Sequence, residues 1–402
     1  MTESNRLWTK GYILLLLANL FLYFGFYLLS PVIQLHTTLI GGSSLEASLT
    51  IGCFSVTSLI FRMFGGNISD VLGEKPIAVT GLLVMFVTTF LFMFLPPKGI
   101  ILFRMLQGIG WGLASAAITT AVSKIIPKNY IGRGMGYFSL TTIISIAFSP
   151  IVALVLMEIY GFSAVIMTSV SLVTASGMII LPMAAITLTQ RSDDRTLKLA
   201  HIIERSAVFP SFLEFLMILP AAGMVSMMAL YARVIHYEHI WIYFIGFSLI
   251  SMITRPFLGK IYDKRGHREI ILVGAACMIA AFINLAFART TLPLVVSSIL
   301  YGFGYGAIHP SLQAWAVSTP DPSRKGSANG TFLSSMDLGY AVGAPMLGIF
   351  SSHYGFFNMY LFSSLFIIVL IVLYIGYLYK NKRVKLLQNG RMIKQPQKNS
   401  GL

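Results

Sequence analysis

Hydrophobic residues in this chain fall into long runs that are separated by short polar or charged segments. Each run is long enough to supply the roughly twenty apolar residues that a helix needs to cross the hydrocarbon core of a bilayer. Six runs precede a polar stretch and six follow it, at 11–35, 46–65, 76–95, 98–122, 134–158, 162–187, 209–233, 240–258, 270–288, 292–317, 329–351 and 356–379. The pattern therefore predicts an all-α membrane protein of twelve transmembrane helices.

The composition agrees with a chain whose solvent is a bilayer. Of the 402 residues, 56% are hydrophobic and 11% are charged, whereas an ordinary soluble domain is about 25% charged. A net charge of +15 would suggest nucleic acid in a soluble protein. Here the basic residues lie in short loops between apolar runs, so we expect no nucleic-acid partner.

The distribution of basic residues predicts the orientation. With both termini in the cytoplasm, the inner loops hold most of the lysines and arginines, and the outer connections hold little beyond Lys98, Arg233 and Arg289. Cytoplasmic loops are enriched in such residues. We therefore expect a multi-pass protein of the inner (cytoplasmic) membrane with both ends inside. The first run is too long for a signal-peptide core and is expected to remain as the first span.

The two sets of six spans are related by an internal repeat. Arg62, Gly66, Asp70 and Gly73 recur 193 residues later as Arg255, Gly259, Asp263 and Gly266. Gly108-x-Gly110-x-Gly112 recurs as Gly302-x-Gly304-x-Gly306, and Tyr160-Gly161-Phe162 recurs as Tyr354-Gly355-Phe356, both 194 residues later. Three matches in the same order indicate a duplicated six-helix unit. We predict a first bundle at 1–188, a cytoplasmic linker at 189–208, a second bundle at 209–380 and a basic disordered tail at 381–402.

The loops after the second and eighth spans carry a family resemblance. Gly66-Asn-Ile-Ser-Asp70-Val-Leu-Gly73-Glu-Lys75 resembles the signature loop of the major facilitator superfamily, and Gly259-Lys-Ile-Tyr-Asp263-Lys-Arg-Gly266-His-Arg268 resembles it more closely. Arg104-Met-Leu-Gln107-Gly-Ile-Gly110 is similar to the Arg-x-x-Gln-Gly-x-Gly element of its proton-linked members. The resemblance implies two pseudo-symmetric six-helix bundles that alternate access to a central site, as in bacterial drug/proton antiporters and metallophore exporters. It also implies a working monomer.

The chemistry of the two loops predicts a gate on the inner face. A carboxylate at the end of a span can accept hydrogen bonds from a neighbouring helix N-terminus or pair with a cation, although Asp70 and Asp263 could also be solvated turn residues. We assign Arg62, Lys75, Arg255 and Arg268 and the loop glycines to the same gates. Val71 and Glu74 stand where the family favours basic residues, so we expect the first gating network to be the weaker one.

Ionisable residues inside a span are costly and are therefore candidates for function. Asp337 in the eleventh span is the first candidate for proton exchange, and His309 and Glu214 are the others. A structural role for His309 and an interfacial position for Glu214 remain open. Arg104 and Gln107 on the fourth span are expected to meet the substrate, unless Arg104 extends to the outer surface.

Aromatic and polar residues of several spans are expected to line the substrate cavity. They are Asn19, Tyr23, Tyr27, Trp111 and Trp315. An adaptable apolar wall of this kind suits amphiphilic cargo, although aromatic residues also act as anchors at membrane interfaces.

The sequence thus favours a transporter that moves a small molecule, with proton-coupled export of an amphiphilic compound or metallophore preferred. The first span holds no carboxylate, and Ser149-Pro150 replaces the Gly-rich Gly-Pro motif of antiporters. Both departures leave open a facilitator or importer of a nutrient solute without obligatory proton coupling. A non-transporting sensor on a transporter scaffold is the remote alternative. No cofactor, metal site or enzyme activity is expected, because the seven histidines and two cysteines are scattered and no nucleophile–base set is apparent.

Overall fold

The computed structural model describes residues 6–183, 202–235 and 241–393, and within these ranges the chain forms helices and no strands. Residues 189–201 of the predicted linker (189–208) lie outside the described residues, and so do residues 394–402 of the predicted tail.

The first half of the chain forms six long helices. They are α1 (Lys10–Leu39), α2 (Ser44–Leu72), α3 (Glu74–Leu91), α4 (Pro97–Ile125), α5 (Ile131–Tyr160) and α6 (Phe162–Ile180), with the short helix η2 (Lys128–Tyr130) before α5. The second half repeats this order. Its helices are α7 (Arg205–Val234), α8 (Trp241–Arg265), α9 (Arg268–Ala286), α10 (Thr291–Ser318) and α11 (Lys325–Ile393), with the short helix η5 (Pro322–Arg324) before α11.

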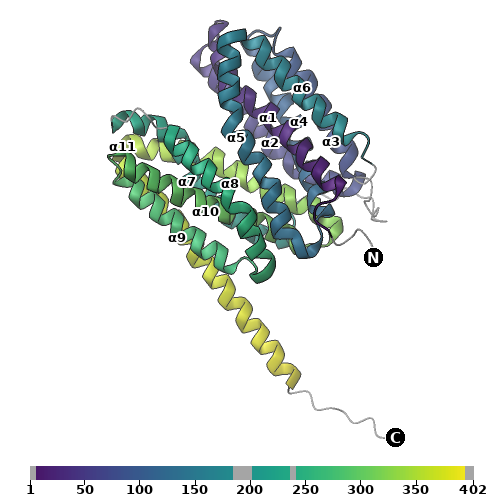
Figure 1. The fold of residues 1–402 in the computed structure, drawn as a ribbon, viewed down its shortest axis with the longest axis vertical. Coiled ribbons are helices and arrows are strands. Elements are labelled where there is room, and N and C mark those ends of the chain that lie inside the picture. Colours follow the sequence, from purple (N-terminus) through teal and green to yellow (C-terminus); the bar gives the residue numbers. More distant parts are fainter. Residues whose placement is uncertain (1–5, 184–201, 236–240, 394–402) are drawn as a thin grey trace.

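The last two predicted spans appear as one element that is broken at Gly355. Eleven helices of the described residues are long and apolar enough to cross a membrane, and the last candidate, Pro322–Lys380, is 59 residues long. At about 1.5 Å per residue such a length would cross a bilayer core of about 30 Å more than twice. Gly355 adopts φ 76° and ψ 167°, a left-handed conformation that favours glycine. Two helices meet at this kink, and α11 doubles back on itself in Figure 1, which is consistent with twelve spans.

Two lobes make up the molecule. The helices α1–α6 form one and α7–α11 form the other, and the lobes meet at one end and diverge at the other (Figure 1). At the meeting end, α2 packs against α11 and α5 packs against α8. We call this the closed end; it carries the α2–α3, α4–α5, α8–α9 and α10–α11 connections. The open end carries the α1–α2 and α5–α6 connections and Gly355.

Local signals in the sequence mark where helices begin and where the chain turns between them. At the open end, Ser43 and Glu46 form a reciprocal capping box that begins α2, which satisfies backbone N–H groups that have no partner within the helix. Glu46 precedes the membrane span of this helix, Leu49–Leu72, and hydrogen bonds from Ser43 hold its pKa below its usual range. At the closed end, Gly73 adopts φ 93° between α2 and α3.

The helix α11 runs on into the predicted tail. The helix α11 continues to Ile393, beyond the predicted boundary at residue 380, and extends past the rest of the bundle (Figure 1). Residues 380–388 are rich in Lys, Arg, Leu and Gln, which are favourable in helices, so the helix does not end where the apolar run ends.

Candidate functional site

A cavity lies between the two lobes. Its volume is about 770 Å³, and side chains of both halves form its wall. Ile51 and Gly52 line it near the open end of α2, and Arg62 lines it deeper along the same helix. The cavity size falls within the range that holds drug-sized ligands.

An ion pair joins the two lobes inside this cavity. Arg62 Nη1 of α2 lies 2.9 Å from Asp337 Oδ1 of α11, and Ser58 Oγ approaches Asp337 Oδ2 at 3.5 Å. Arg62 Nε also donates to Ser115 Oγ at 3.2 Å. The Asp337 side chain is 19% exposed and that of Arg62 is 2% exposed. Each of these two charges is stabilised by the other, because desolvation makes an unpaired buried charge costly in free energy.

The side chains of Arg62 and Arg255 lie apart from the loops to whose gates they were assigned. Both side chains line the cavity. The helices α2 and α8 begin at the open end, and long side chains on a helix lean toward its N-terminus. The two guanidinium groups therefore point away from the loops that follow them.

A second buried pair forms within the second lobe. His309 Nδ1 of α10 lies 2.6 Å from Glu214 Oε1 of α7. His309 lines the cavity and stacks against Tyr305, with ring centroids 5.6 Å apart. Glu214 is fully buried, and its second carboxylate oxygen has no hydrogen-bond partner among the described residues. Glu214 therefore lies in the protein core beside the cavity and not at the membrane interface.

Arg104 reaches the cavity, whereas Gln107 does not line it. Arg104 Nε donates to the Thr50 carbonyl at 3.2 Å, and Arg104 Nη1 donates to Gln107 Oε1 at 2.5 Å. Gln107 in turn donates to Thr89 Oγ1 at 2.7 Å. The expectation that Gln107 contacts substrate is therefore corrected: it holds Arg104 from behind. Arg104 is only 1% exposed, so it does not extend to the outer surface.

An aromatic cluster lines the first-half wall of the cavity. Tyr23 and Phe26 of α1 lie against Trp111 of α4, with the Phe26 and Trp111 ring centroids 4.1 Å apart. Tyr27 packs against Tyr23 and Phe26. The Arg62 guanidinium lies 5.5 Å from the centroid of Trp111. Tyr23, Tyr27 and Trp111 are thus placed where the sequence predicted them.

The other two predicted wall residues lie elsewhere. Asn19 is fully buried and donates to Thr141 Oγ1 of α5 at 2.8 Å. Trp315 stacks on His267 at the closed end, with ring centroids 4.1 Å apart. Burial lowers the pKa of His267 to about 4. Trp315 is three residues from the end of α10, and this position places it beyond the cavity.

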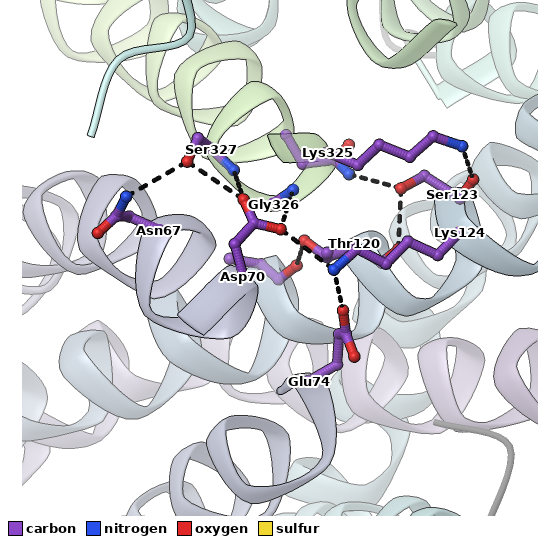
Figure 2. A network of polar contacts seen from close by, with 11 residues as sticks. Asn67, Asp70, Glu74, Thr120, Ser123, Lys124, Lys325, Gly326 and Ser327 are labelled. Carbon is purple, nitrogen blue, oxygen red and sulfur yellow. Dashed lines mark hydrogen bonds and ion pairs between the residues drawn. The ribbon is translucent and has the colours of Figure 1, made fainter. Parts of the chain in front are cut away.

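The first copy of the repeated loop forms a polar network across the closed end (Figure 2). Asp70 accepts hydrogen bonds from the backbone N–H groups of Gly326 (2.9 Å) and Ser327 (2.8 Å), at the start of α11. Lys124 Nζ of α4 lies 3.1 Å from Asp70 and 2.5 Å from Glu74. The predicted contact of a carboxylate with a helix N-terminus and a cation is present.

The second copy makes the corresponding contact in the opposite direction. Asp263 accepts from the N–H of Gly132 at 2.7 Å and from Arg133 Nε at 2.9 Å, at the start of α5. In the first network Lys124 pairs with both Glu74 and Asp70 within the first lobe, whereas the Arg133–Asp263 ion pair of the second network joins the two lobes. That the first network is the weaker one stays a prediction.

Glycines allow the two lobes to approach at the closed end. A Cβ atom on Gly66 would lie 2.1 Å from the Gly326 carbonyl oxygen, and one on Gly259 would lie 2.8 Å from that of Gly132. Gly266 adopts φ 75° in the turn after α8. Lys75 is only partly buried and Arg268 is exposed. The cations that contact the two carboxylates are Lys124 at Asp70 and Arg133 at Asp263.

Sequence reasoning missed the partners of the two carboxylates. The repeat did contain a signal for them, because Gly132 and Gly326 are separated by 194 residues, the same offset as in two of the three other matches. As for metal sites, the described ranges hold no group of three or more His, Cys, Asp or Glu residues that could bind an ion. Cys53 and Cys277 are free thiols.

Comparison with known proteins gives a family and a fold. The sequence model described as Major Facilitator Superfamily matches residues 15–330 and 244–394. An uncharacterized MFS-type transporter of Methanocaldococcus jannaschii is 24% identical over 366 residues, which cover 85% of this chain and 91% of that protein. The staphylopine export protein of Staphylococcus aureus is 20% identical over 364 residues (86% and 90%). Among solved structures, the human organic anion transporter MFSD10 (TETRAN) superposes with a TM-score of 0.76 at 16% identity, over 93% of this chain and 100% of that one.

Proposed function

This chain belongs to the Major Facilitator Superfamily, and we propose that it is a secondary transporter that exports a small amphiphilic molecule across the cytoplasmic membrane in exchange for protons. The observation that carries the proposal is the cavity of about 770 Å³ between the lobes, with the Arg62–Asp337 ion pair joining the lobes inside it. The family consists of transporters and not of enzymes.

Alternating access requires a gate that exists in one state and breaks in the other. The Asp70 and Asp263 networks supply such a gate, because each carboxylate lies on one lobe and its backbone donors lie on the other. With both termini in the cytoplasm, as the basic loops predict, the closed end faces the cytoplasm. This conformation then exposes the cavity to the outside.

Proton coupling is assigned to Asp337. Its carboxylate is balanced by Arg62, and protonation would remove the charge that holds α11 to α2. The His309–Glu214 pair is a second site for a proton, because the two groups share a short hydrogen bond beside the cavity. The first event changes a charge between the two lobes, whereas the second changes a charge within the second lobe, beside the cavity.

The direction of transport rests on a relative. The staphylopine export protein matches over most of both chains, which supports export and includes a metallophore among the candidate substrates. A facilitator without proton coupling is the second candidate. It is favoured by α1, whose contribution to the cavity wall consists of Tyr23, Phe26, Tyr27 and Ser30 without a carboxylate.

The test uses inside-out membrane vesicles that contain the overproduced protein, with an interior acidified by respiration and a pH gradient reported by a quenched dye. Candidate amphiphiles are added one at a time to wild-type, Asp337→Asn and Glu269→Gln vesicles. The last is a matched carboxylate control, because Glu269 is exposed and pairs only with Arg265 at the surface among the described residues.

We expect at least one compound to release protons from wild-type and Glu269→Gln vesicles and not from Asp337→Asn vesicles, although all three proteins insert equally. If Asp337→Asn transports at the wild-type rate against a gradient, the coupling assignment is wrong. Uptake that persists after the proton gradient is collapsed would favour the facilitator.

A further inference from the structure

Three arginines line the cavity, and they differ in how their charge is balanced. Arg62 is paired with Asp337 at 2.9 Å. Arg104 donates to neutral acceptors, the Thr50 carbonyl and the Gln107 side chain. Arg255 is 1% exposed, and within the part of the chain that the structure describes it makes no hydrogen bond or ion pair, while its Nε is buried without a partner.

Among the described residues, the surroundings of Arg255 supply no anion that is hydrogen-bonded or ion-paired to it. Its guanidinium lies 5.8 Å from the ring centroid of Tyr305. Glu214 acts on it electrostatically but forms no ion pair with it, and the bonded oxygen of Glu214 is held by His309 at 2.6 Å. A buried guanidinium without an acceptor is costly, and this favours a role in which the acceptor is not part of the protein.

The internal repeat shows which group is absent. Arg255 of α8 is the repeat of Arg62 of α2. The helix α2 packs on α11 and α8 packs on α5, so the counterpart of Asp337 on α11 should lie on α5. Two glycine pairs at the closed end, Gly132/Gly326 and Gly136/Gly330, are each separated by 194 residues. They fix the displacement between α5 and α11 at 194 residues.

Applied to Asp337, this displacement leads to Ile143. Ile143 lines the same cavity, is 2% exposed and packs in the hydrophobic cluster of the second lobe. The second half of the site therefore has the cation of the Arg62–Asp337 pair and an aliphatic side chain in place of its carboxylate. The repeat is present on one side of the contact, as Arg62 and Arg255, and absent on the other, as Asp337 and Ile143.

We propose that the substrate is an amphiphilic organic anion whose carboxylate, or equivalent acidic group, binds Arg255 in the place of the missing aspartate. Arg can hold a carboxylate through two parallel N–H···O bonds. Phe247, Tyr301 and Tyr305 line the cavity on the same lobe, and their rings pack together with centroids 5.3–6.1 Å apart. They provide the surface for the apolar part of the molecule. The inference rests on the proposed function only in taking this cavity as the substrate site.

The first experiment measures equilibrium binding to the purified full-length protein in detergent, without any ion gradient. The probes are matched in shape: 2-naphthoate (anionic), 2-naphthamide (neutral) and 2-naphthylmethylammonium (cationic). We expect the wild-type protein to bind the anion at least tenfold more tightly than the other two. Arg255→Gln should weaken anion binding by about 10- to 100-fold, the range of a charge-assisted hydrogen bond, and should leave amide binding within about threefold. Equal binding of the three probes, or preference for the cation, would overturn the proposal.

The second experiment restores the missing carboxylate. Ile143→Asp should pair with Arg255 as Asp337 pairs with Arg62, and should therefore reduce 2-naphthoate affinity far more than the uncharged Ile143→Asn does. Thermal unfolding shows whether the new pair forms: Ile143→Asp should be more stable in the presence of Arg255 than in the Arg255→Gln background. Equal effects of Asp and Asn on both measurements would show that no anion binds at this position.

The two proposals fail separately. Anion-selective binding without proton release in vesicles would refute proton coupling and leave the substrate class standing. Proton release driven by neutral or cationic amphiphiles, with no anion preference in binding, would refute the substrate class and leave the exporter standing.

Discussion

Removing the charge of Asp70 should shift the protein out of the conformation described here. The carboxylate accepts from Gly326 N–H (2.9 Å), Ser327 N–H (2.8 Å) and Ser327 Oγ (3.2 Å), and it contacts Lys124 at 3.1 Å. In Asp70→Asn one oxygen becomes an NH₂ group, which faces N–H donors and a lysine and can accept from none of them.

The magnitude follows from the hydrogen bonds that the side-chain amide cannot make. A hydrogen bond to a charged group contributes about 1.5–3 kcal/mol, and the substitution removes one such bond outright and weakens the others, so the closed end should lose about 2–4 kcal/mol. At about 1.4 kcal/mol per tenfold change, the ratio of the two conformations shifts by about 30- to 1000-fold.

The assay is a distance distribution between spin labels at the open end. Cysteines that replace Leu39 on α1 and Ser352 on α11 are placed at exposed positions, and Cys53 and Cys277 are replaced by serine so that only these two positions are labelled. We expect Asp70→Asn to move the population from a long to a shorter distance, because opening one end brings the other together. Asp263→Asn should act in the same direction.

Glu269→Gln provides the control, since it removes a carboxylate that is exposed and lies on one lobe only. If neither aspartate variant changes the distribution relative to this control, the two networks do not act as a gate. A change in Asp263→Asn alone would show that the additional contacts of Asp70 carry little free energy.

Two further predictions concern packing and pH. Gly110→Val should reduce thermal stability by about 1–3 kcal/mol or prevent folding, because even a Cβ would lie 2.7 Å from the Gly81 carbonyl oxygen. Gly376→Val should have little effect, because nothing lies within 4 Å of a Cβ at that position. Equal melting temperatures of the two variants would contradict this reasoning. The pKa of about 4 for His267 lies below the unfolded value near 6.5, so the unfolded chain takes up the proton first. The stability that neutral His267 contributes should therefore be complete above pH 6.5 and fall by up to about 3 kcal/mol as the pH drops toward 4. His267→Phe should flatten melting curves over that range, and an unchanged slope would show that this ring does not titrate as described.

The spans could be predicted from sequence because the requirement for apolar length is local. The positions of Asp337 and His309 were also accessible, since a charge within an apolar run must face the protein interior. The direction of a side chain along its helix was harder to predict. Arg62 lies only two turns from Asp70, and proximity in sequence suggested a shared role until the lean of the side chain toward the open end separated them.

Apart from the repeat of Gly132 and Gly326, the sequence carries no signal for the partners of the site residues. Gly326 and Ser327 become neighbours of Asp70 only when the two lobes are docked. Lys124 reaches Asp70 through the packing of α4 against α2 within the first lobe. The same holds for Gln107, whose side chain could have turned toward the cavity and instead bonds Thr89 on the neighbouring helix. Helical periodicity assigns a residue to a face, and packing decides what that face touches.

The glycine contacts at the closed end bear on how tightly the protein blocks ions. Gly66 meets Gly326 and Gly259 meets Gly132 with no side chain between them, so backbone lies against backbone where the two lobes touch. Side-chain rotamers change in picoseconds to nanoseconds, whereas whole helices move in microseconds to milliseconds. At these two contacts there is no side chain to swing aside, so they open only when entire helices separate. A membrane that is kept energised needs this kind of seal, because a brief leak repeated in every copy would discharge the gradient.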